Sequence, residues 1–403
     1  MLSLGEAKRV LYDGCKEENA MTTARMTSRE RLLAAYRHKP VDRIPCSPRV
    51  HAWMREYYGD SGLASILRMA DEFGFDPHLN VGVFSHPVGL TPSVDFQLPN
   101  VEAWISKEEP DGDLRVVRRV FRTPAGELTD VTKVPPPGDR SFGVSPNPFR
   151  TEYLVKGRED VEALRFLVLD PGAASLDYYF NAERCFGDRG LVALNIMSPL
   201  CHRAGDAVSM VDLMIAFYED REFFDAIVDL FHDQMMREIE YAIQGGVVHF
   251  FANWYYNSMS AGWSPTIWRD VFAPQLTAMC DRVHAAGGTV NFYDDGKFMP
   301  IADLLADTGI DVLQTLTPPP VGDTDLAELK RCIGDRVCLM GYVDLIYVVQ
   351  RGTPELIEQT VREAIETAGP TGFILGSSDS FRDGTPVENI RAYFDASRRY
   401  GET

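Results

Sequence analysis

TVNFYDDGK, residues 289–297, decides the fold, because it joins a short apolar run to an abrupt polar end. The apolar part predicts a buried strand. Two adjacent carboxylates, Asp294 and Asp295, follow it, and Gly296 then permits any backbone angle. In a parallel α/β fold, polar residues at the carboxyl end of a strand line the functional site. We therefore expect the mouth of a site here.

The same order of buried strand, polar tip and helix recurs on both sides of this stretch. Further strands are predicted at 191–197, 247–251, 312–316, 337–341 and 372–376, with helices at 207–244, 265–284, 298–308, 323–333 and 353–368 between them. Repeated β-α units with near-continuous apolar strands indicate a parallel sheet. No G-x-G-x-x-G or P-loop phosphate turn occurs. A closed (β/α)8 TIM barrel of about seven or eight recognisable strands is therefore favoured over a doubly wound sheet.

The first 160 residues add three features to this barrel. Residues 1–26 predict a polar, N-terminal helical arm, and residues 27–402 the barrel itself. A helix is expected to start at the Ser or Thr cap near Thr27, and a short strand follows at 42–46, where Asp42 and Arg43 suit a structural ion pair or cap. At about 100–160, alternating strands at 116–123 and 128–134 flank a turn and predict an inserted β-hairpin that forms a flap.

Composition excludes several classes of function. The formal net charge of −19 argues against binding to nucleic acid or to an anionic membrane, because phosphate contacts need a basic face. No apolar run is long enough to span a membrane, and the N-terminus lacks the apolar core of a secretion signal. The seven cysteines are scattered without a C-x-x-C pair, which favours reduced thiols and a cytoplasmic location.

Four segments carry a resemblance to a known family. They are SRER (28–31) with PVDRIP (40–45), GWSP (262–265) with FAP (272–274), GYVD (341–344), and TPVENI (385–390). In this order and spacing they resemble the uroporphyrinogen decarboxylase superfamily over about residues 27–402. That TIM-barrel group contains the decarboxylase and methyltransferases linked to corrinoids or coenzyme M. The hairpin turn TPAGEL (123–128) is closer to the methyltransferase-type branch.

The resemblance also shows what has changed at the site. The decarboxylase's arginine-rich R-Q-A-G-R signature is absent, and only Arg49 and Arg55 lie in that neighbourhood. Zinc-dependent methyltransferases of the family carry H-x-C-G and a later cysteine; Tyr293, Asp295 and Asp379 stand at those positions here. The soft nitrogen and sulfur ligands of the zinc site are thus replaced by oxygen.

Three hypotheses follow for Tyr293, Asp295 and Asp379. Asp295 and Asp379 could hold a divalent metal that prefers oxygen ligands, such as Mg²⁺, Mn²⁺ or Ca²⁺, or zinc weakly. Without a metal, the two carboxylates could act as acid and base, with Tyr293 donating a proton. The third hypothesis is that they are surface acids that cap a helix or pair with Lys297 or Arg382.

Other strand tips supply candidate substrate-binding residues. Asn253, Trp254 and Tyr255 form a polar and aromatic tip suited to stacking on a ring or to plain packing. Arg203 follows another tip and could clamp an anion or simply lie in solvent. Arg49, Arg382 and Tyr342 complete the substrate-binding set.

The preferred function is methyl transfer from a small methoxylated or methylated compound to a corrinoid or folate-type carrier, as the resemblance implies. A corrinoid protein would then be a partner, and a homodimer is expected because barrels of this family often pair. The first alternative is a decarboxylase of uroporphyrinogen or of a small carboxylic acid. The second is a non-catalytic barrel that has lost its zinc ligands.

Overall fold

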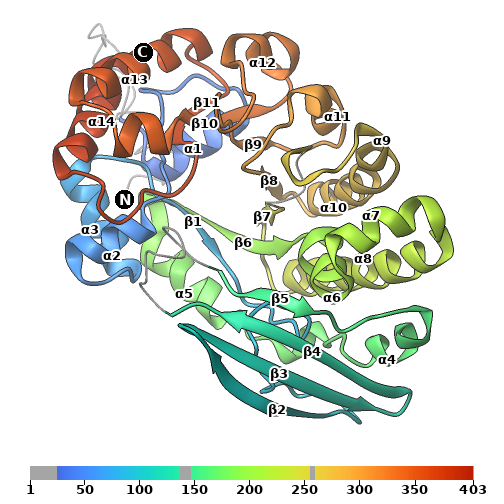
Figure 1. Ribbon diagram of the computed structural model, residues 1–403. Helices are drawn as coiled ribbons and strands as arrows, with labels where there is room; N and C mark the ends of the chain where they lie inside the picture. The colour runs from blue at the N-terminus through green and yellow to red at the C-terminus, as the bar shows by residue number, and fades with distance from the viewer. Residues whose placement is uncertain (1–24, 137–146, 255–258, 403) are drawn as a thin grey trace, which may run out of the picture.

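The computed structural model describes residues 25–136, 147–254 and 259–402, so the predicted arm at 1–26 lies almost wholly outside it. Its central feature is a seven-stranded parallel sheet that curves into a half-barrel (Figure 1). In spatial order the strands are β1 (His78–Val81), β6 (Leu191–Met197), β7 (His249–Asn253), β8 (Thr289–Tyr293), β9 (Val312–Thr315), β10 (Cys338–Val343) and β11 (Phe373–Ser377). The predicted α/β class is confirmed, and β6 has the predicted bounds.

Helices pack around the outside of this sheet (Figure 1). They include α1 (Ser28–Tyr36), α2 (His51–Tyr58), α3 (Leu63–Phe73), α5 (Asp177–Phe186), α6 (Gly205–Val208), α7 (Met210–Glu219), α8 (Arg221–Gln244), α10 (Ala273–Ala285), α11 (Ala302–Asp307), α12 (Leu326–Ile333), α13 (Pro354–Ala368) and α14 (Val387–Tyr400). The predicted helix starts at Thr27 and Pro265 are confirmed, and each depends on a capping side chain next to the helix. Thr27 and Glu30 form a capping box, and Ser264 caps α9 (Pro265–Ile267).

A short segment connects the two outer strands of the sheet. Cys46 forms a parallel bridge with Leu375 of β11, and the Leu375 N–H donates to the Pro45 carbonyl over 2.9 Å. On its other side, the Asp76 N–H donates to the Cys46 carbonyl over 2.7 Å, just before β1. The short strand predicted at 42–46 is therefore present as this connection, with only the isolated bridge in place of a longer ladder.

The inserted hairpin is one half of a larger structure. The predicted strands are β3 (Leu114–Thr123) and β4 (Gly126–Val134), and they belong to a four-stranded antiparallel sheet with β2 (Glu102–Asp111) and β5 (Phe149–Glu152) at its edges. The prediction missed β2 because most of its side chains are exposed, so it lacks alternation of apolar and polar residues. Residues 137–146, within the insertion predicted at about 100–160, lie outside the described part of the chain.

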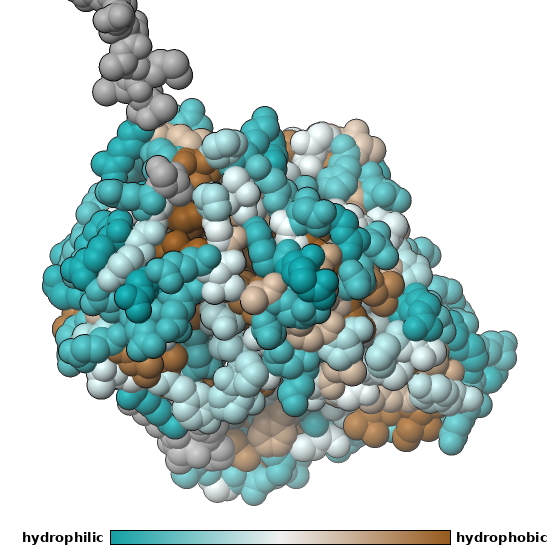
Figure 2. Space-filling model, turned by 90° about the horizontal axis from the view of Figure 1, so that it is seen from above, coloured by the Kyte–Doolittle hydropathy of each residue, from teal (hydrophilic) through white to brown (hydrophobic). Residues whose placement is uncertain are grey.

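The surface is polar over most of the face seen in Figure 2, with hydrophobic patches between hydrophilic ones. Large exposed apolar side chains include Val211, Ile215 and Tyr218 on α7. No helix within the described ranges is long and apolar enough to cross a membrane.

A buried group of charges lies beside the connecting segment. Asp76 is fully buried; its Oδ1 accepts from Arg31 Nη1 over 2.5 Å, and its Oδ2 lies 2.8 Å from Arg43 Nη1. The same carboxylate accepts from the Cys46 N–H over 3.1 Å. Arg31 also pairs with Asp42, Nε to Oδ1 2.6 Å. The predicted structural role of Asp42 and Arg43 is thus confirmed, although each pairs with a distant residue and not with its neighbour.

We expect Asp76→Asn to lower the free energy of unfolding by about 3–5 kcal/mol, because it removes the buried counter-charge of Arg43 and one of the two carboxylates that pair with Arg31. Urea unfolding followed by circular dichroism measures this. The control is Asp71→Asn, whose side chain is 70% exposed and pairs with Arg189, and which we expect to cost less than about 1 kcal/mol. Equal losses in the two variants would contradict a special role for Asp76.

Candidate active site

The parallel sheet places the ends of β8 and β11 at the same rim. Tyr293 is the last residue of β8, with Asp295 two residues beyond it, and Asp379 lies two residues beyond the end of β11. Tyr293 is buried inside the barrel and packs at a tilt on Phe251 of β7, with ring centroids 5.6 Å apart. The predicted location of these three residues, at the carboxyl ends of the strands, is what the fold produces.

Arg49 connects these groups. It lies between the connecting segment and α2, and its carbonyl accepts from the Phe381 N–H over 2.8 Å. The guanidinium carbon lies 4.5 Å from the centroid of the Tyr293 ring, and Nη1 lies 3.8 Å from Asp379 Oδ1. A cation over a tyrosine face is attracted by the ring quadrupole, so this stacking also fixes the position of the guanidinium.

Asp379 is an anion held by two arginines. Arg382 pairs with its Oδ2, while Arg49 lies near Oδ1. The Ser380 N–H donates to the same Oδ1 over 2.6 Å. The hypothesis that Asp379 pairs with Arg382 is confirmed, but the pair lines a cavity and does not cap a helix.

In contrast to Asp379, Asp295 lies in an environment that disfavours the charged form of its carboxyl group. Burial, and after it the charge of Asp379, raises the pKa of the Asp295 carboxyl, while Arg49 and Arg382 oppose this more weakly. Burial also raises the pKa of the Tyr293 hydroxyl, so the phenol keeps its proton. Two neighbouring carboxylates with different environments are the arrangement that divides acid and base roles.

A cavity of about 300 Å³ opens beside these groups. It is lined by polar residues and a few apolar ones: Asp295, Thr317, Val321, Asp344, Leu345, Ile346, Gln350, Arg351, Ser378, Asp379 and Arg382. A volume near the lower end of the range for ligand pockets suits a small substrate.

The donor set does not fit the zinc ion of the family's methyltransferases. Across the described ranges, no group of three or more His, Cys, Asp or Glu side chains is placed to hold a metal. The two carboxylates at the ligand positions, Asp295 and Asp379, have no thiolate or imidazole beside them. Arg49 and Arg382 already neutralise Asp379, and a metal cation would have to compete with both guanidinium groups.

Two of the predicted substrate-binding residues at the end of β7 are described. Asn253 pairs in register with Tyr293 on the next strand, and its Nδ2 lies 3.6 Å from Met197 Sδ. Trp254 is fully buried and packs edge-on against Phe292, which leaves no face for a substrate. The stacking hypothesis for Trp254 is therefore corrected to packing. Tyr255 lies outside the described residues.

Arg203 and Tyr342 are placed away from the site. Arg203 is fully buried and pairs with Glu238 of α8, Nη2 to Oε2 2.5 Å, so it is an internal ion pair and not an exposed anion clamp. Asp325 and Glu363, which belong to the helical layer at α12 and α13, are the charges that act on Tyr342. Tyr342 is not among the residues that line the cavity at Asp295 and Asp379.

Sequence reasoning missed Asp344, two residues after Tyr342. Asp344 lines the cavity, and its Oδ1 accepts from the Tyr347 N–H over 2.5 Å at the start of a π-helical turn, Leu345–Gln350. Ser378, also missed, accepts from the Leu345 N–H over 3.0 Å. The available signal was its position: Asp344 directly follows the buried strand β10, at the carboxyl end where site residues of such folds lie.

Comparisons with known proteins are consistent with this geometry. Residues 202–400 match the family model described as Uroporphyrinogen decarboxylase (URO-D). Uroporphyrinogen decarboxylase 2, chloroplastic, of Oryza sativa subsp. japonica is 22% identical over 206 residues, which cover 50% of each chain. Methylated-thiol–coenzyme M methyltransferase of Methanosarcina mazei is 26% identical over 130 residues, 32% of this chain and 29% of that protein.

A solved structure extends the likeness to the whole fold. The methyltransferase from Methanosarcina mazei covers 93% of this chain and 99% of its own, with a TM-score of 0.60 and 17% identity. The chain spans about half the length of the curated decarboxylases that it matches. The resemblance to the uroporphyrinogen decarboxylase superfamily, with relatives of both the decarboxylase and the methyltransferase kind, is confirmed.

The raised pKa of Asp295 predicts a pH-dependent penalty. Between the ordinary aspartate pKa and the raised one, the folded state holds a proton that the unfolded state has lost, so stability falls as pH rises through this window. We expect Asp295→Asn to raise the melting temperature at pH 8 relative to the unaltered protein, and to change it little at pH 4. Differential scanning calorimetry at both values checks this.

Asp303→Asn serves as the control, because the Asp303 side chain is 77% exposed. It should shift the melting temperature equally and slightly at both pH values. A lower melting temperature of Asp295→Asn than of the unaltered protein at pH 8 would contradict this prediction, because it would show that the ionised carboxylate stabilises the folded state.

Proposed function

From the resemblance to the uroporphyrinogen decarboxylase superfamily, we propose that this chain is an enzyme that transfers a methyl group. The donor is a small methoxylated or methylated compound, and the acceptor is a corrinoid or folate-type carrier that acts as co-substrate. The observation that carries the proposal is Asp295, a carboxyl group with a raised pKa at the wall of a cavity of about 300 Å³.

The residues at the strand ends suit the proton part of this reaction. When the bond between the methyl carbon and the substrate oxygen breaks, its electron pair stays on that oxygen, which then needs a proton. Asp295 is placed to give it, because its raised pKa keeps the acid form available nearer neutral pH. The methyl carbon forms its new bond with an electron pair of the carrier. Asp295 afterwards recovers a proton from solvent.

Arg49, Arg382 and Tyr293 have supporting roles in this proposal. The two guanidinium groups lie beside Asp379, and the charge of Asp379 in turn favours the protonated form of Asp295. Tyr293 fixes Arg49 by stacking and keeps its own proton. In this proposal the two carboxylates have different roles without a metal: Asp295 donates the proton, and Asp379 raises the pKa of Asp295.

Decarboxylation of a small carboxylic acid is the second candidate, and one observation favours it. Arg382 lines the cavity and Arg49 lies beside it, so two guanidinium groups are available to a substrate carboxylate that displaces Asp379. Loss of CO₂ leaves an electron pair on carbon, and the protonated Asp295 could neutralise it. The modest size of the cavity favours a small acid over a tetrapyrrole.

We expect Asp295→Asn to lower kcat/KM at least about 100-fold, the usual contribution of a general acid. The assay supplies methoxylated aromatic compounds and reduced cobalamin as carrier, and follows the methylated corrinoid by its absorption spectrum. In parallel, small carboxylic acids are tested for release of CO₂. Asp303→Asn, on the exposed surface, should keep full activity.

The outcomes separate the alternatives. Methylated carrier without CO₂ supports methyl transfer, and CO₂ without methylated carrier supports the decarboxylase. If Asp295→Asn and Asp379→Asn leave every measured activity and ligand affinity unchanged, both catalytic proposals fail and the non-catalytic barrel stands.

A further inference from the structure

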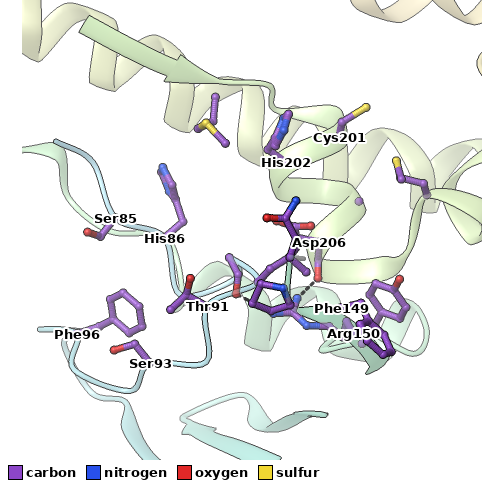
Figure 3. Close-up of a pocket in the computed structure, with 18 of the residues that line it drawn as sticks. Ser85, His86, Thr91, Ser93, Phe96, Phe149, Arg150, Cys201, His202 and Asp206 are labelled. Atoms are coloured by element: carbon purple, nitrogen blue, oxygen red, sulfur yellow. Dashed lines mark hydrogen bonds between the residues drawn. The ribbon is translucent and has the colours of Figure 1, made fainter. Parts of the chain in front are cut away.

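A second cavity, of about 760 Å³, lies between the inserted sheet and the carboxyl ends of β1 and β6. None of the residues in the proposed mechanism lines it. Its lining comes from the loop after β1, from β5 and its flanks, and from the chain after β6: Ser85, His86, Gly89, Leu90, Thr91, Ser93, Asp95, Phe96, Asn147, Pro148, Phe149, Arg150, Tyr153, Met197, Cys201, His202, Gly205, Asp206 and Met210. Figure 3 shows these side chains arranged around a common space.

Arg150 on β5 forms one wall of the cavity, and both of its terminal nitrogens make polar contacts there. Its Nη1 donates to the Val88 carbonyl over 2.9 Å and to the Asp206 carbonyl, and its Nη2 donates to the Gly89 carbonyl over 2.8 Å. Nη2 also lies 3.2 Å from Asp130 on β4. The inserted sheet is therefore tied to the loop after β1 and to α6, and the terminal nitrogens of Arg150 are committed to these contacts.

Asp130 strengthens this wall, because it pairs with a second buried arginine. Arg119 on β3 lies within 2.6 Å of Asp130, and both side chains are fully buried. Arg119 Nη1 donates to the Ser93 carbonyl over 2.7 Å in the loop that lines the cavity. The cavity is thus a built feature of the insertion and not a gap between loosely packed segments.

Asp206 on α6 is one of two acidic residues in the lining (Figure 3); the other, Asp95, is exposed. Within the described part of the chain, its carboxylate makes no hydrogen bond; only its backbone carbonyl is used, by Arg150. Burial raises the pKa of this carboxyl to about 7, and the charge of Arg150 opposes the rise. Asp206 is half-buried, and its carboxylate oxygens have open acceptor sites that a donor or a cation in the cavity can reach.

The other titratable groups around Asp206 are neutral or distant. Burial lowers the pKa of His202 to about 3 and that of His86 well below its usual value, and Arg203 adds to both shifts. Burial raises the pKa of Tyr153, beyond β5, and of Cys201, beside His202, so both keep their protons. Apart from Arg150, the lining contains no arginine or lysine, so the lining offers no uncommitted cation.

Apolar side chains form the rest of the lining. Phe96 and Phe149 come from the side of the inserted sheet, and Met197 and Met210 from the side of the barrel. Methionine and aromatic side chains together suit a flat apolar body, because the thioether adapts its shape and packs favourably on ring edges.

We propose that this cavity binds a small organic amine, with its protonated nitrogen at the Asp206 carboxylate and its apolar body between Phe96, Phe149, Met197 and Met210. The described lining sets the charge of the ligand: Arg150 is committed to other contacts, and the acids Asp206 and Asp95 favour a cation. This proposal concerns binding at the insertion and does not depend on the reaction at the ends of β8 and β11.

Three probes of similar shape test the proposal by isothermal titration calorimetry: benzylamine, benzyl alcohol and benzoate. At pH 8 we expect benzylamine to bind at least about tenfold more tightly than benzyl alcohol, and benzoate not to bind, since a charged hydrogen bond contributes more than 1.4 kcal/mol. Between pH 8 and pH 6, benzylamine affinity should fall about tenfold, because Asp206 takes up a proton with a pKa of about 7.

Variants locate the binding. Asp206→Asn keeps the shape of the side chain and should weaken benzylamine at least about tenfold and remove the pH dependence. Phe96→Ala should weaken benzylamine and benzyl alcohol alike, which places the ring in this cavity. Asp225→Asn, on the outer surface of α8 beside Arg221, is the matched control and should leave all affinities unchanged. Circular dichroism confirms that each variant is folded.

Benzoate binding more tightly than benzylamine would overturn the proposal, as would unchanged benzylamine affinity in folded Asp206→Asn. Absence of binding by all three probes at millimolar concentration would overturn it too. Because the readout is affinity and not turnover, none of these results bears on Asp295.

Discussion

The buried carboxylate of Asp76 is the contact on which the architecture depends. It holds Arg31 of α1, Arg43 before the connecting segment and the backbone of Cys46, which in turn bridges to β11. This anchor acts together with the backbone contacts of Ile44, Pro45 and Ser47 to hold the segment between β11 and β1. The rim where Arg49 meets Tyr293 follows this segment directly, so the position of the candidate site depends on a charge cluster at some distance from it.

What could be predicted from the sequence depended on the range of the interaction. The caps at Thr27 and Ser264 and the bounds of β6 were predicted, because they depend on neighbouring residues alone. The packing of Trp254 could not be predicted, because its burial against Phe292 depends on a distant segment. The partners of Asp42 and Arg43 were hidden for the same reason.

The candidate site lies where the resemblance predicts it, but its side chains carry different chemical groups. Tyr293, Asp295 and Asp379 lie together at the strand ends, as alignment to the methyltransferases implied, and oxygen replaces sulfur and nitrogen at each. Arg49 and Arg382 supply positive charge beside Asp379, Arg382 as a direct ion pair and Arg49 at 3.8 Å. The guanidinium groups of such a site can stabilise an anion without a metal ion.

The connection at Cys46 also governs the order in which the chain can mature during synthesis. Pro45 and Ser47 leave the ribosome early, but their partner Leu375 emerges only after nearly the whole described chain. Until then, the nascent sheet has an open edge at this segment, and open edges invite pairing with other chains. The backbone contact between Ile44 and Gly401 forms later still. The sheet edge at this segment can therefore pair only after Leu375 has been synthesised.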